Sequence, residues 1–260
     1  MINDMSQKFS CSTDDLFLDF VGINHLIWAQ KVLLRGKDVT AEAIEKICDA
    51  SSKEIMANIP EVHYSPEFLR SLGMIPVSYL KYYYLQPQML EECLADSKSK
   101  GVRSEVVKGV ESELFTLYQD TDLKEKPEQL ARRGGARYSD AACSLIDSIY
   151  NNKKDIQVVN VMNSGCNLDL PEDAVIERNC IIDSNGAHPI QIGHTPLKIR
   201  GLLQNVKAYE QLTIQAAIYG DRDAALQALT IHPLVNSAET ARLMLNDILR
   251  ENQAFLPNFA

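Results

Sequence analysis

The chain has 260 residues, of which 45% are hydrophobic, so it can bury a sizeable core in one large domain or in two. Its formal net charge of −9 argues against a nucleic-acid partner, because phosphate binding requires clustered lysine and arginine. No apolar run approaches the roughly 18 residues of a membrane span, and Met1 to Ser10 is too polar for a signal peptide. We therefore expect a cytoplasmic protein with no membrane partner.

Near the start of the chain, Ser12-Thr13-Asp14-Asp15 has the pattern of a capping box and predicts a short helix through Phe20. The apolar segment from Ile23 to Leu34 predicts a strand that ends in a turn at Arg35-Gly36-Lys37-Asp38. Thr40 is expected to cap the next helix, since apolar residues recur after it at helical spacing.

Proline, glycine and apolar spacing outline the helices that follow. Ser65-Pro66-Glu67 predicts a helix with proline at its first position and Gly73 at its end. Residues 79–96 are predicted to form a helix with a break near Pro87. Apolar residues three or four positions apart predict a helix over 103–119, and helices also fit 128–133 and 139–150.

The hydrophobic period then changes from 3.6 to 2, and Asn185-Gly186 is a strong hairpin signal. This pattern predicts strands over 156–161, 174–182 and 188–192, followed by helices over 197–219, 223–230 and 237–252. Helices interrupted by one cluster of strands indicate an α+β fold. We expect it to be helix-dominated, with a small, mainly antiparallel sheet.

The six cysteines show neither a C-x-x-C spacing nor a regular interval, so the sequence suggests no zinc module and no disulfide framework. Cys48, Cys93 and Cys143 fall at apolar positions of helical patterns, and we expect them to be small buried hydrophobes. Because the sequence suggests no disulfides, we expect the protein to reside in a reducing compartment.

Short motifs occur in a fixed order from about Phe17 to the C-terminus, and together they resemble the family 4 glycoside hydrolases. They are Gly22-Ile23-Asn24-His25-Leu26-Ile27-Trp28, Ile75 to Tyr84, Arg103-Ser104-Glu105-Val106, Arg133 to Ser139, Val159 to Gly165 and His232 to Val235. The Asn-His-Leu-x-Trp form is similar to the branch that acts on 6-phospho-β-glucosides. The resemblance implies the fold of the C-terminal domain shared by lactate dehydrogenase-like proteins and this family.

The resemblance covers only the later part of a family member. Members open with an NAD-binding half, and no Gly-x-Gly-x-x-Gly segment that opens a β-α-β unit occurs in these 260 residues. The family's metal-binding cysteine motif is also missing, since Cys11 stands in a different context. We therefore expect residues 1–260 to be a C-terminal substrate and metal domain that is inactive by itself.

The resemblance implies an NAD-dependent route, which differs from the two-carboxylate scheme of most glycosidases. In that route the sugar is oxidised at C3, a base removes the C2 proton, the C1 substituent leaves, and water adds before the hydride returns. A divalent metal, usually Mn²⁺, stabilises the charge on the C2 and C3 oxygens. His25 matches the family's metal-ligand histidine, and the adjacent Asn24 has a side chain that can orient it or the sugar; the alternative is a buried core histidine on a strand.

Tyr79 matches the tyrosine to which the family assigns proton abstraction, and Tyr83, one helical turn away, is the second candidate. We expect Tyr82 and Tyr84 to pack in the core. Arg103 matches a substrate-binding arginine, and the alternative is an exposed residue in a first helical turn.

Arg133-Gly134-Gly135 predicts a tight turn near the cleft, to which the sequence assigns no contact. Asp221 is expected to cap the helix that follows Gly220. The remaining histidines match no catalytic position and are expected to be structural; they are His63, His188, His194 and His232.

The leading hypothesis is thus the C-terminal half of an NAD- and Mn²⁺-dependent 6-phospho-β-glucosidase, whose partners are a phosphorylated disaccharide or β-glucoside and further copies of itself. Two alternatives remain open. One is a non-catalytic helical domain for oligomerisation or binding. The other is a family member specific for α-linked substrates, because β specificity rests on Leu26 alone.

Overall fold

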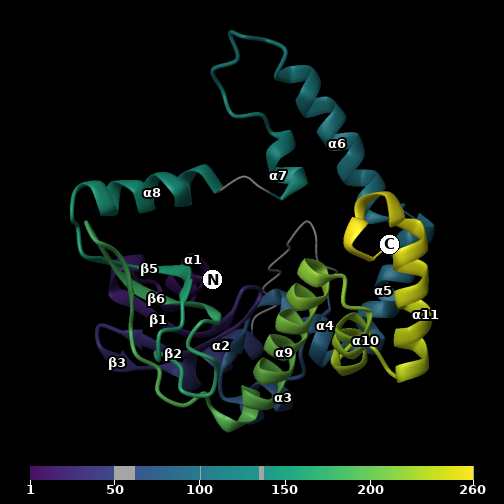
Figure 1. The fold of residues 1–260 in the computed structure, drawn as a ribbon. Helices are drawn as coiled ribbons and strands as arrows, with labels where there is room; N and C mark the ends of the chain where they lie inside the picture. Colours follow the sequence, from purple (N-terminus) through teal and green to yellow (C-terminus); the bar gives the residue numbers. More distant parts are fainter. Residues whose placement is uncertain (50–61, 100, 135–137, 260) are drawn as a thin grey trace. The chain divides into compact units, whose positions relative to one another are not determined.

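A computed structural model describes residues 1–49, 62–99, 101–134 and 138–259 (Figure 1). The described chain is mostly helical and carries one four-stranded and one three-stranded sheet, which confirms the predicted α+β class. It divides into two compact units. Unit 1 comprises Met1–Phe20, Trp28–Val158 and Asn179–His188, and unit 2 comprises Val21–Ile27, Val159–Arg178 and Pro189–Ala260.

The four-stranded sheet is built around β2 (Leu26–Leu34), which lies between β1 (Leu16–Ile23) and β3 (Lys37–Asp38). The short β4 (Ile75–Pro76) also pairs with β2, and both β3 and β4 run antiparallel to it. Trp28, opposite Pro76 in this register, is fully buried. The predicted strand to Leu34 is confirmed, although it begins only after a turn at Asn24 and His25.

The predicted helix through Phe20 is wrong. Ser12 does cap, since its hydroxyl accepts a hydrogen bond from Asp14 N at 3.3 Å, but the helix is a single 3₁₀ turn, η1 (Thr13–Asp15). Beyond it, Leu16 and Leu18 are buried with a half-buried residue between them, which is the period of a strand. Burial on the sheet therefore overrides the local helix signal.

The apolar core of unit 1 lies between this sheet and three helices, which are α1 (Ile2–Phe9), α2 (Thr40–Asp49) and α3 (Pro66–Leu72). The sequence had not indicated α1. This core consists of Met5, Leu16, Leu18, Ala29, Val32, Val39, Ala43, Ile44, Leu69 and Ile75.

The start of α2 differs from the prediction in its cap. The Asp38 carboxylate, not Thr40, accepts from Thr40 N at 2.9 Å, while the Thr40 hydroxyl accepts from Val32 N at 2.9 Å. Thr40 therefore ties the helix to β2. By contrast, α3 begins and ends as predicted, with Ser65 accepting from Phe68 N and Gly73 left-handed at a φ of 67°.

The helical segment after β4 is divided into η2 (Ser78–Leu80), α4 (Lys81–Tyr84) and α5 (Gln86–Ser99). The break falls at Leu85, where the backbone leaves the helical region, so the predicted interruption near Pro87 is confirmed. The remaining predicted helices of unit 1 are also present: α6 (Arg103–Leu117), α7 (Gln129–Arg133) and α8 (Tyr138–Tyr150).

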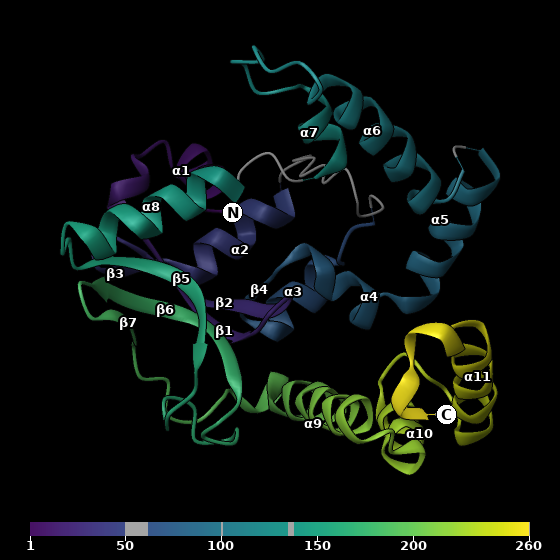
Figure 2. The same cartoon turned by 45° about the horizontal axis from the view of Figure 1, so that its top comes forward.

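The three-stranded sheet consists of β5 (Asp155–Met162), β6 (Val175–Asp183) and β7 (Gly186–Pro189), in that order. Helix α8 runs beside β5 (Figure 2), and Gln157 on that strand donates to the Ser148 hydroxyl of the helix at 2.7 Å. The predicted hairpin at Asn185-Gly186 is confirmed, although β7 begins at the glycine and is shorter than expected.

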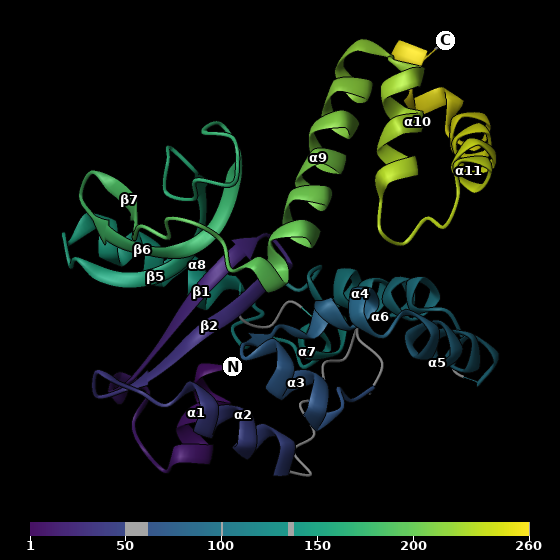
Figure 3. The ribbon, with the colours of Figure 1, turned by 90° about the horizontal axis from the view of Figure 1, so that it is seen from below.

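Unit 2 ends in three helices, α9 (Leu197–Tyr219), α10 (Arg222–Ile231) and α11 (Ala238–Glu251), followed by the short η3 (Gln253–Phe255) and η4 (Pro257–Phe259). Figure 3 shows α10 folded back along α9. Gly220 ends α9 in the left-handed conformation, and the Asp221 carboxylate then accepts from Ala224 N at 2.9 Å. The predicted cap at Asp221 is confirmed.

Within the described residues, no helix has the length and apolar character needed to cross a membrane.

The expectation that the cysteines are buried is wrong for Cys93 and Cys143, which are exposed, while the buried cysteines are Cys166 and Cys180. In both exposed cases the cysteine lies on a helix with few buried residues.

Candidate functional site

The Asn24–His25 turn joins β1 to β2, and both of its side chains are exposed. Neighbouring residues on either side, Ile23 and Leu26, are buried, so the turn presents two polar side chains at the end of an apolar hairpin. His25 has a positive φ of 65°, a conformation that non-glycine residues adopt at a cost of about 1 kcal/mol. His25 is therefore not a core histidine on a strand.

The backbone of the His25 turn has a partner on β6. The His25 N–H donates to Glu177 Oε2 at 3.3 Å, across 152 residues of sequence. Glu177 is half-buried, and this burial raises the pKa of its carboxyl, an effect that the His25 N–H partly offsets. Sequence reasoning did not identify Glu177, because nothing in the local pattern of β6 points to a partner so distant in sequence.

Whether these residues suit a metal ion is decided by the donor set. An exposed imidazole is a suitable ligand for Mn²⁺ or a similar ion. Among the described residues, however, no group of three or more His, Cys, Asp or Glu side chains is placed to hold a metal. His25 as a metal ligand therefore stays a prediction, and a complete site would need donors beyond this set.

Tyr79 lies in η2 and Tyr83 in α4, and both side chains are half-buried. The 3₁₀ turn places Tyr79 directly after β4, whose residues Ile75 and Pro76 pair with β2. Tyr79 is therefore attached to the four-stranded sheet through a very short connection. Its role in proton transfer stays a prediction.

Tyr84 belongs to an aromatic cluster. Its ring centroid lies 4.9 Å from that of Phe68 and 6.3 Å from that of Tyr64. Burial raises the pKa of both phenols, because the charged form loses hydration. The prediction that Tyr84 packs in the core agrees with this cluster. Tyr82 is half-buried and burial raises the pKa of its phenol, but its core packing stays a prediction.

Arg103 is the first residue of α6, and its Nη2 donates to the carbonyls of Arg132 and Arg133, both at 3.0 Å. A cation at these last carbonyls of α7 interacts favourably with the helix dipole. The guanidinium is thus a link between two helices. Both of these hydrogen bonds use Nη2, so Nε and Nη1 take no part in this contact.

The end of α7 carries further ion pairs to α6: Arg132 with Glu113, and Arg133 with Glu111 at 2.8 Å. Gly134 follows in the left-handed conformation, with a φ of 93°, as the predicted tight turn requires. Gly135, the last residue of the predicted turn, lies outside the described residues.

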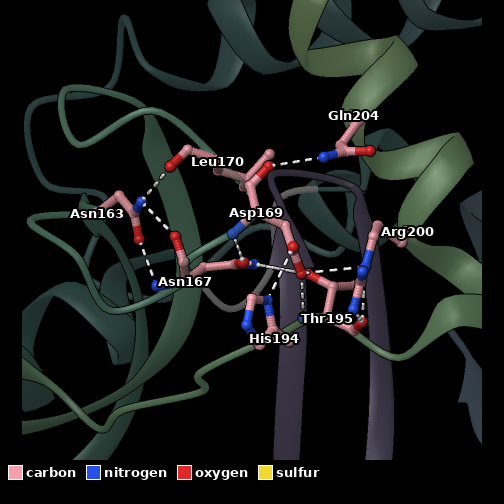
Figure 4. Close-up of polar contacts among 8 residues, drawn as sticks. All are labelled: Asn163, Asn167, Asp169, Leu170, His194, Thr195, Arg200 and Gln204. Atoms are coloured by element: carbon pink, nitrogen blue, oxygen red, sulfur yellow. Dashed lines mark hydrogen bonds and ion pairs between the residues drawn. The ribbon is translucent and has the colours of Figure 1, made fainter.

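A buried polar network in unit 2 centres on Asn163 and Asp169 (Figure 4). The Asn163 Nδ2 donates to Asn167 O at 2.8 Å and Leu170 O at 3.0 Å, and its Oδ1 accepts from Asn167 N at 2.7 Å. These bonds hold together the loop that follows β5. Sequence reasoning placed Val159 to Gly165 in the family motif without assigning Asn163 this role.

Asp169 joins the same loop to the start of α9. Its carboxylate accepts from Thr195 N at 2.7 Å and lies 3.1 Å from Arg200 Nε, while His194 Nδ1 stands 3.0 Å away (Figure 4). Burial opposes ionisation, but the hydrogen bonds and the Arg200 charge hold the pKa of Asp169 below its usual value. His194 accordingly has a structural partner.

Two other histidines, His188 and His232, are also in structural contacts. His188 Nε2 lies 2.9 Å from Asp183 Oδ1. His232 packs edge-on against Tyr209, with ring centroids 4.5 Å apart, and its Nδ1 accepts from Leu234 N at 3.2 Å. Burial lowers the pKa of His232, which favours the neutral ring.

The sequence and the structure of the chain are similar to those of known proteins. Residues 20–235 match the family described as "Family 4 glycosyl hydrolase C-terminal domain". A probable 6-phospho-beta-glucosidase of Bacillus subtilis is 42% identical over 98% of this chain, and the 6-phospho-beta-glucosidase of Escherichia coli is 38% identical over 95%. The chain covers 58% and 56% of these relatives' own lengths.

A solved relative is the 6-phospho-beta glucosidase of Thermotoga maritima, in a structure with NAD and glucose-6-phosphate. It aligns with a TM-score of 0.83 at 32% identity, over 98% of this chain and 58% of that one. A second structure of the same protein, with manganese, NAD+ and glucose-6-phosphate, gives a TM-score of 0.82 at 32% identity and the same coverage. On the family match over residues 20–235, this chain belongs to glycoside hydrolase family 4 and corresponds to its C-terminal domain.

Proposed function

We propose that residues 1–260 are the substrate and metal part of a 6-phospho-β-glucosidase, and that NAD is bound by a part of the protein outside them. The 42% and 38% identities to proteins of that name support the activity. Coverage of only 58% of the first of these relatives supports the division into parts. The observation that carries the proposal is His25, exposed on an anchored turn within the matched region.

Each site residue has a proposed role. A bound divalent metal would stabilise negative charge on the C2 and C3 oxygens of the sugar, and NAD would accept the C3 hydride. The His25 imidazole is a ligand of that metal, and Asn24 beside it orients the sugar hydroxyls. The Tyr79 hydroxyl oxygen, once deprotonated, takes the C2 proton.

Arg103 is proposed to bind the substrate with the guanidinium nitrogens that do not contact α7. A guanidinium suits a phosphate group because its planar fork donates two parallel hydrogen bonds. Since Nη2 is held by two carbonyls at 3.0 Å, the group is already oriented before substrate arrives. Arg103 can therefore link α6 to α7 and bind the substrate at the same time.

The substrate is proposed to be a phosphorylated disaccharide or a 6-phospho-β-glucoside, and the site of action the cytoplasm, where NAD and sugar phosphates are retained. We also propose a homo-oligomer. Exposed apolar side chains on α9, α11 and the C-terminus support this, since such surfaces seldom stay in water; they include Leu197, Ile214, Ile218, Tyr219, Leu243 and Phe255.

The experiment joins this chain to the part of the Bacillus subtilis relative that it does not cover, which gives a protein called here the fused enzyme. Release of p-nitrophenol from its 6-phospho-β-glucoside is measured with NAD⁺, Mn²⁺ and a reductant, and the 6-phospho-α-glucoside serves as the matched substrate. We expect turnover of the β substrate, loss of metal-dependent turnover in His25→Ala, and no turnover by the 260 residues alone.

Three outcomes would count against the proposal. Preference for the α substrate would assign the chain to another branch of the family. Equal activity of His25→Ala and wild type at saturating Mn²⁺ would reject His25 as a ligand. A folded fused enzyme that turns over neither substrate would favour a non-catalytic domain.

A further inference from the structure

Strand β6 reaches the β1–β2 hairpin with two side chains, Glu177 and Asn179. Residues two apart on a strand point to the same face, so both can extend toward one neighbour. The side-chain amide of Asn179 bonds to the β1 backbone as a neighbouring peptide group would. Its Oδ1 accepts from Phe20 N at 2.7 Å, and its Nδ2 donates to Leu18 O at 2.9 Å. This face of β6 therefore holds the β1 backbone by side chains rather than by strand pairing.

Glu177 makes the corresponding contact at the turn, where its Oε2 accepts from His25 N at 3.3 Å. The carboxylate is half-buried on β6, whereas His25 is exposed. A charge-assisted hydrogen bond to a backbone N–H is stronger than one between neutral groups. Such a bond can offset the cost of about 1 kcal/mol that His25 incurs at a φ of 65°.

The direction of an imidazole depends on the backbone dihedrals of its own residue. If His25 moved to the extended region, its Cα–Cβ bond would point away from its present direction, whatever rotamer the side chain adopted. A ligand displaced by about 1 Å no longer suits a metal site, because ligand distances are held within about 0.2 Å. The turn conformation is therefore a condition for metal binding.

We propose that Glu177 is a positioning residue, which holds the His25 turn in its left-handed conformation and thereby orients the imidazole. The proposal concerns the backbone contact and rests on the proposed function only where it refers to the metal. Partners that orient metal ligands typically change metal affinity by about 10–100-fold when they are removed.

The first test uses the 260-residue chain, labelled with ¹⁵N, and follows hydrogen exchange of the His25 amide by NMR. Glu177→Ala removes the acceptor and should speed this exchange by roughly 10-fold or more. Glu177→Gln keeps a carbonyl oxygen at the same position and should retain most of the protection. Glu172→Ala, an exposed glutamate in the same unit, is the matched control and should behave as wild type.

A merely structural effect would disturb amides throughout the unit, so the Asn167 N–H, which donates to Asn163 Oδ1, is followed in the same spectra. It should exchange at the wild-type rate in every variant. Unchanged His25 exchange in Glu177→Ala would overturn the proposal. Equal loss of protection in Glu177→Ala and Glu177→Gln would also overturn it, because the acceptor oxygen would then not be the cause.

The second test measures Mn²⁺ affinity of the fused enzyme by electron paramagnetic resonance, without turnover. Glu177→Ala should weaken binding by about 10–100-fold, and Glu177→Gln should restore most of it. This result separates the two proposals. If His25→Ala leaves Mn²⁺ affinity unchanged, the proposed function fails at His25, while the exchange measurement still decides whether Glu177 anchors the turn.

Discussion

Gly22 is the position at which the hairpin that carries His25 is most sensitive to substitution. It has a φ of 156°, and a Cβ added there would lie 2.2 Å from Leu26 O and 2.5 Å from Ile27 Cα. Both atoms belong to the backbone of the facing strand, so they cannot move aside as the end of a side chain can. Gly22→Ala is therefore expected to displace β2 from β1 beside the turn.

The magnitude follows from this geometry. Real Cβ atoms essentially never approach closer than 3.0 Å, so the Leu26 carbonyl would have to shift by at least 0.8 Å, the difference between 3.0 and 2.2 Å. Overpacking of this kind costs about 1–3 kcal/mol, and an unfavourable φ adds about 1 kcal/mol. A loss of about 2–4 kcal/mol corresponds to a fall in Tm of roughly 5–15 °C for a chain of this size.

The assay is thermal unfolding followed by far-UV circular dichroism, together with urea unfolding at 25 °C. Gly201→Ala is the matched control, because Gly201 lies within α9 in the same unit and a Cβ there would meet nothing within 4 Å. In a helix this change should stabilise by about 0.5–1 kcal/mol. Equal midpoints for Gly22→Ala and Gly201→Ala would show that the added Cβ does not displace β2.

Two further predictions concern unit 2. Because burial lowers the pKa of His232, the unfolded chain binds the proton more readily, so this contribution to stability is present above pH 6.5 and is lost as the pH falls below it. His232→Asn keeps an acceptor two residues before Leu234 and should reduce the change in unfolding free energy between pH 7 and 5; equal slopes would contradict this. Asn163→Ala should lower the unfolding free energy by about 2–4 kcal/mol in urea, because it leaves the buried Asn167 N–H without its acceptor; a loss below about 0.5 kcal/mol would count against the network.

Helices were predictable from the sequence wherever apolar spacing and end signals agreed. The predicted bounds of α9 are those observed, because a long periodic segment ends at Gly220 in the left-handed conformation. Ser65 and Asp221 cap as their residue types indicate. These signals act within a few residues, so a single sequence contains them.

Elements that depend on distant partners were not predictable. The segment of β1 after Ser12 carries a local helix signal, yet the sheet turns Leu16 and Leu18 inward. Thr40 has the residue type of a cap, but its hydroxyl bonds to Val32 N on β2. In each case a contact formed by the fold outweighs the local preference.

The candidate site likewise contains residues that local motifs identify and contacts that depend on distant parts of the fold. The motif order singled out His25 as a metal ligand. The structure shows this residue exposed on a turn, and its role as a ligand stays a prediction. Glu177 was not predictable, since its contact with His25 spans 152 residues. Arg103 was predicted from its motif, whereas the link to the Arg132 and Arg133 carbonyls depends on how α7 packs against α6.

The oxidative route is tested by exchange of the C2 hydrogen of a 6-phospho-β-glucoside with solvent deuterium, catalysed by the fused enzyme and followed by NMR. We expect exchange in the wild type, a fall of roughly 10²-fold or more in Tyr79→Phe, and near-normal exchange in Tyr83→Phe. Hydrolysis without any C2 exchange in the wild type would contradict the oxidative route, and normal exchange in Tyr79→Phe would contradict Tyr79 as its base.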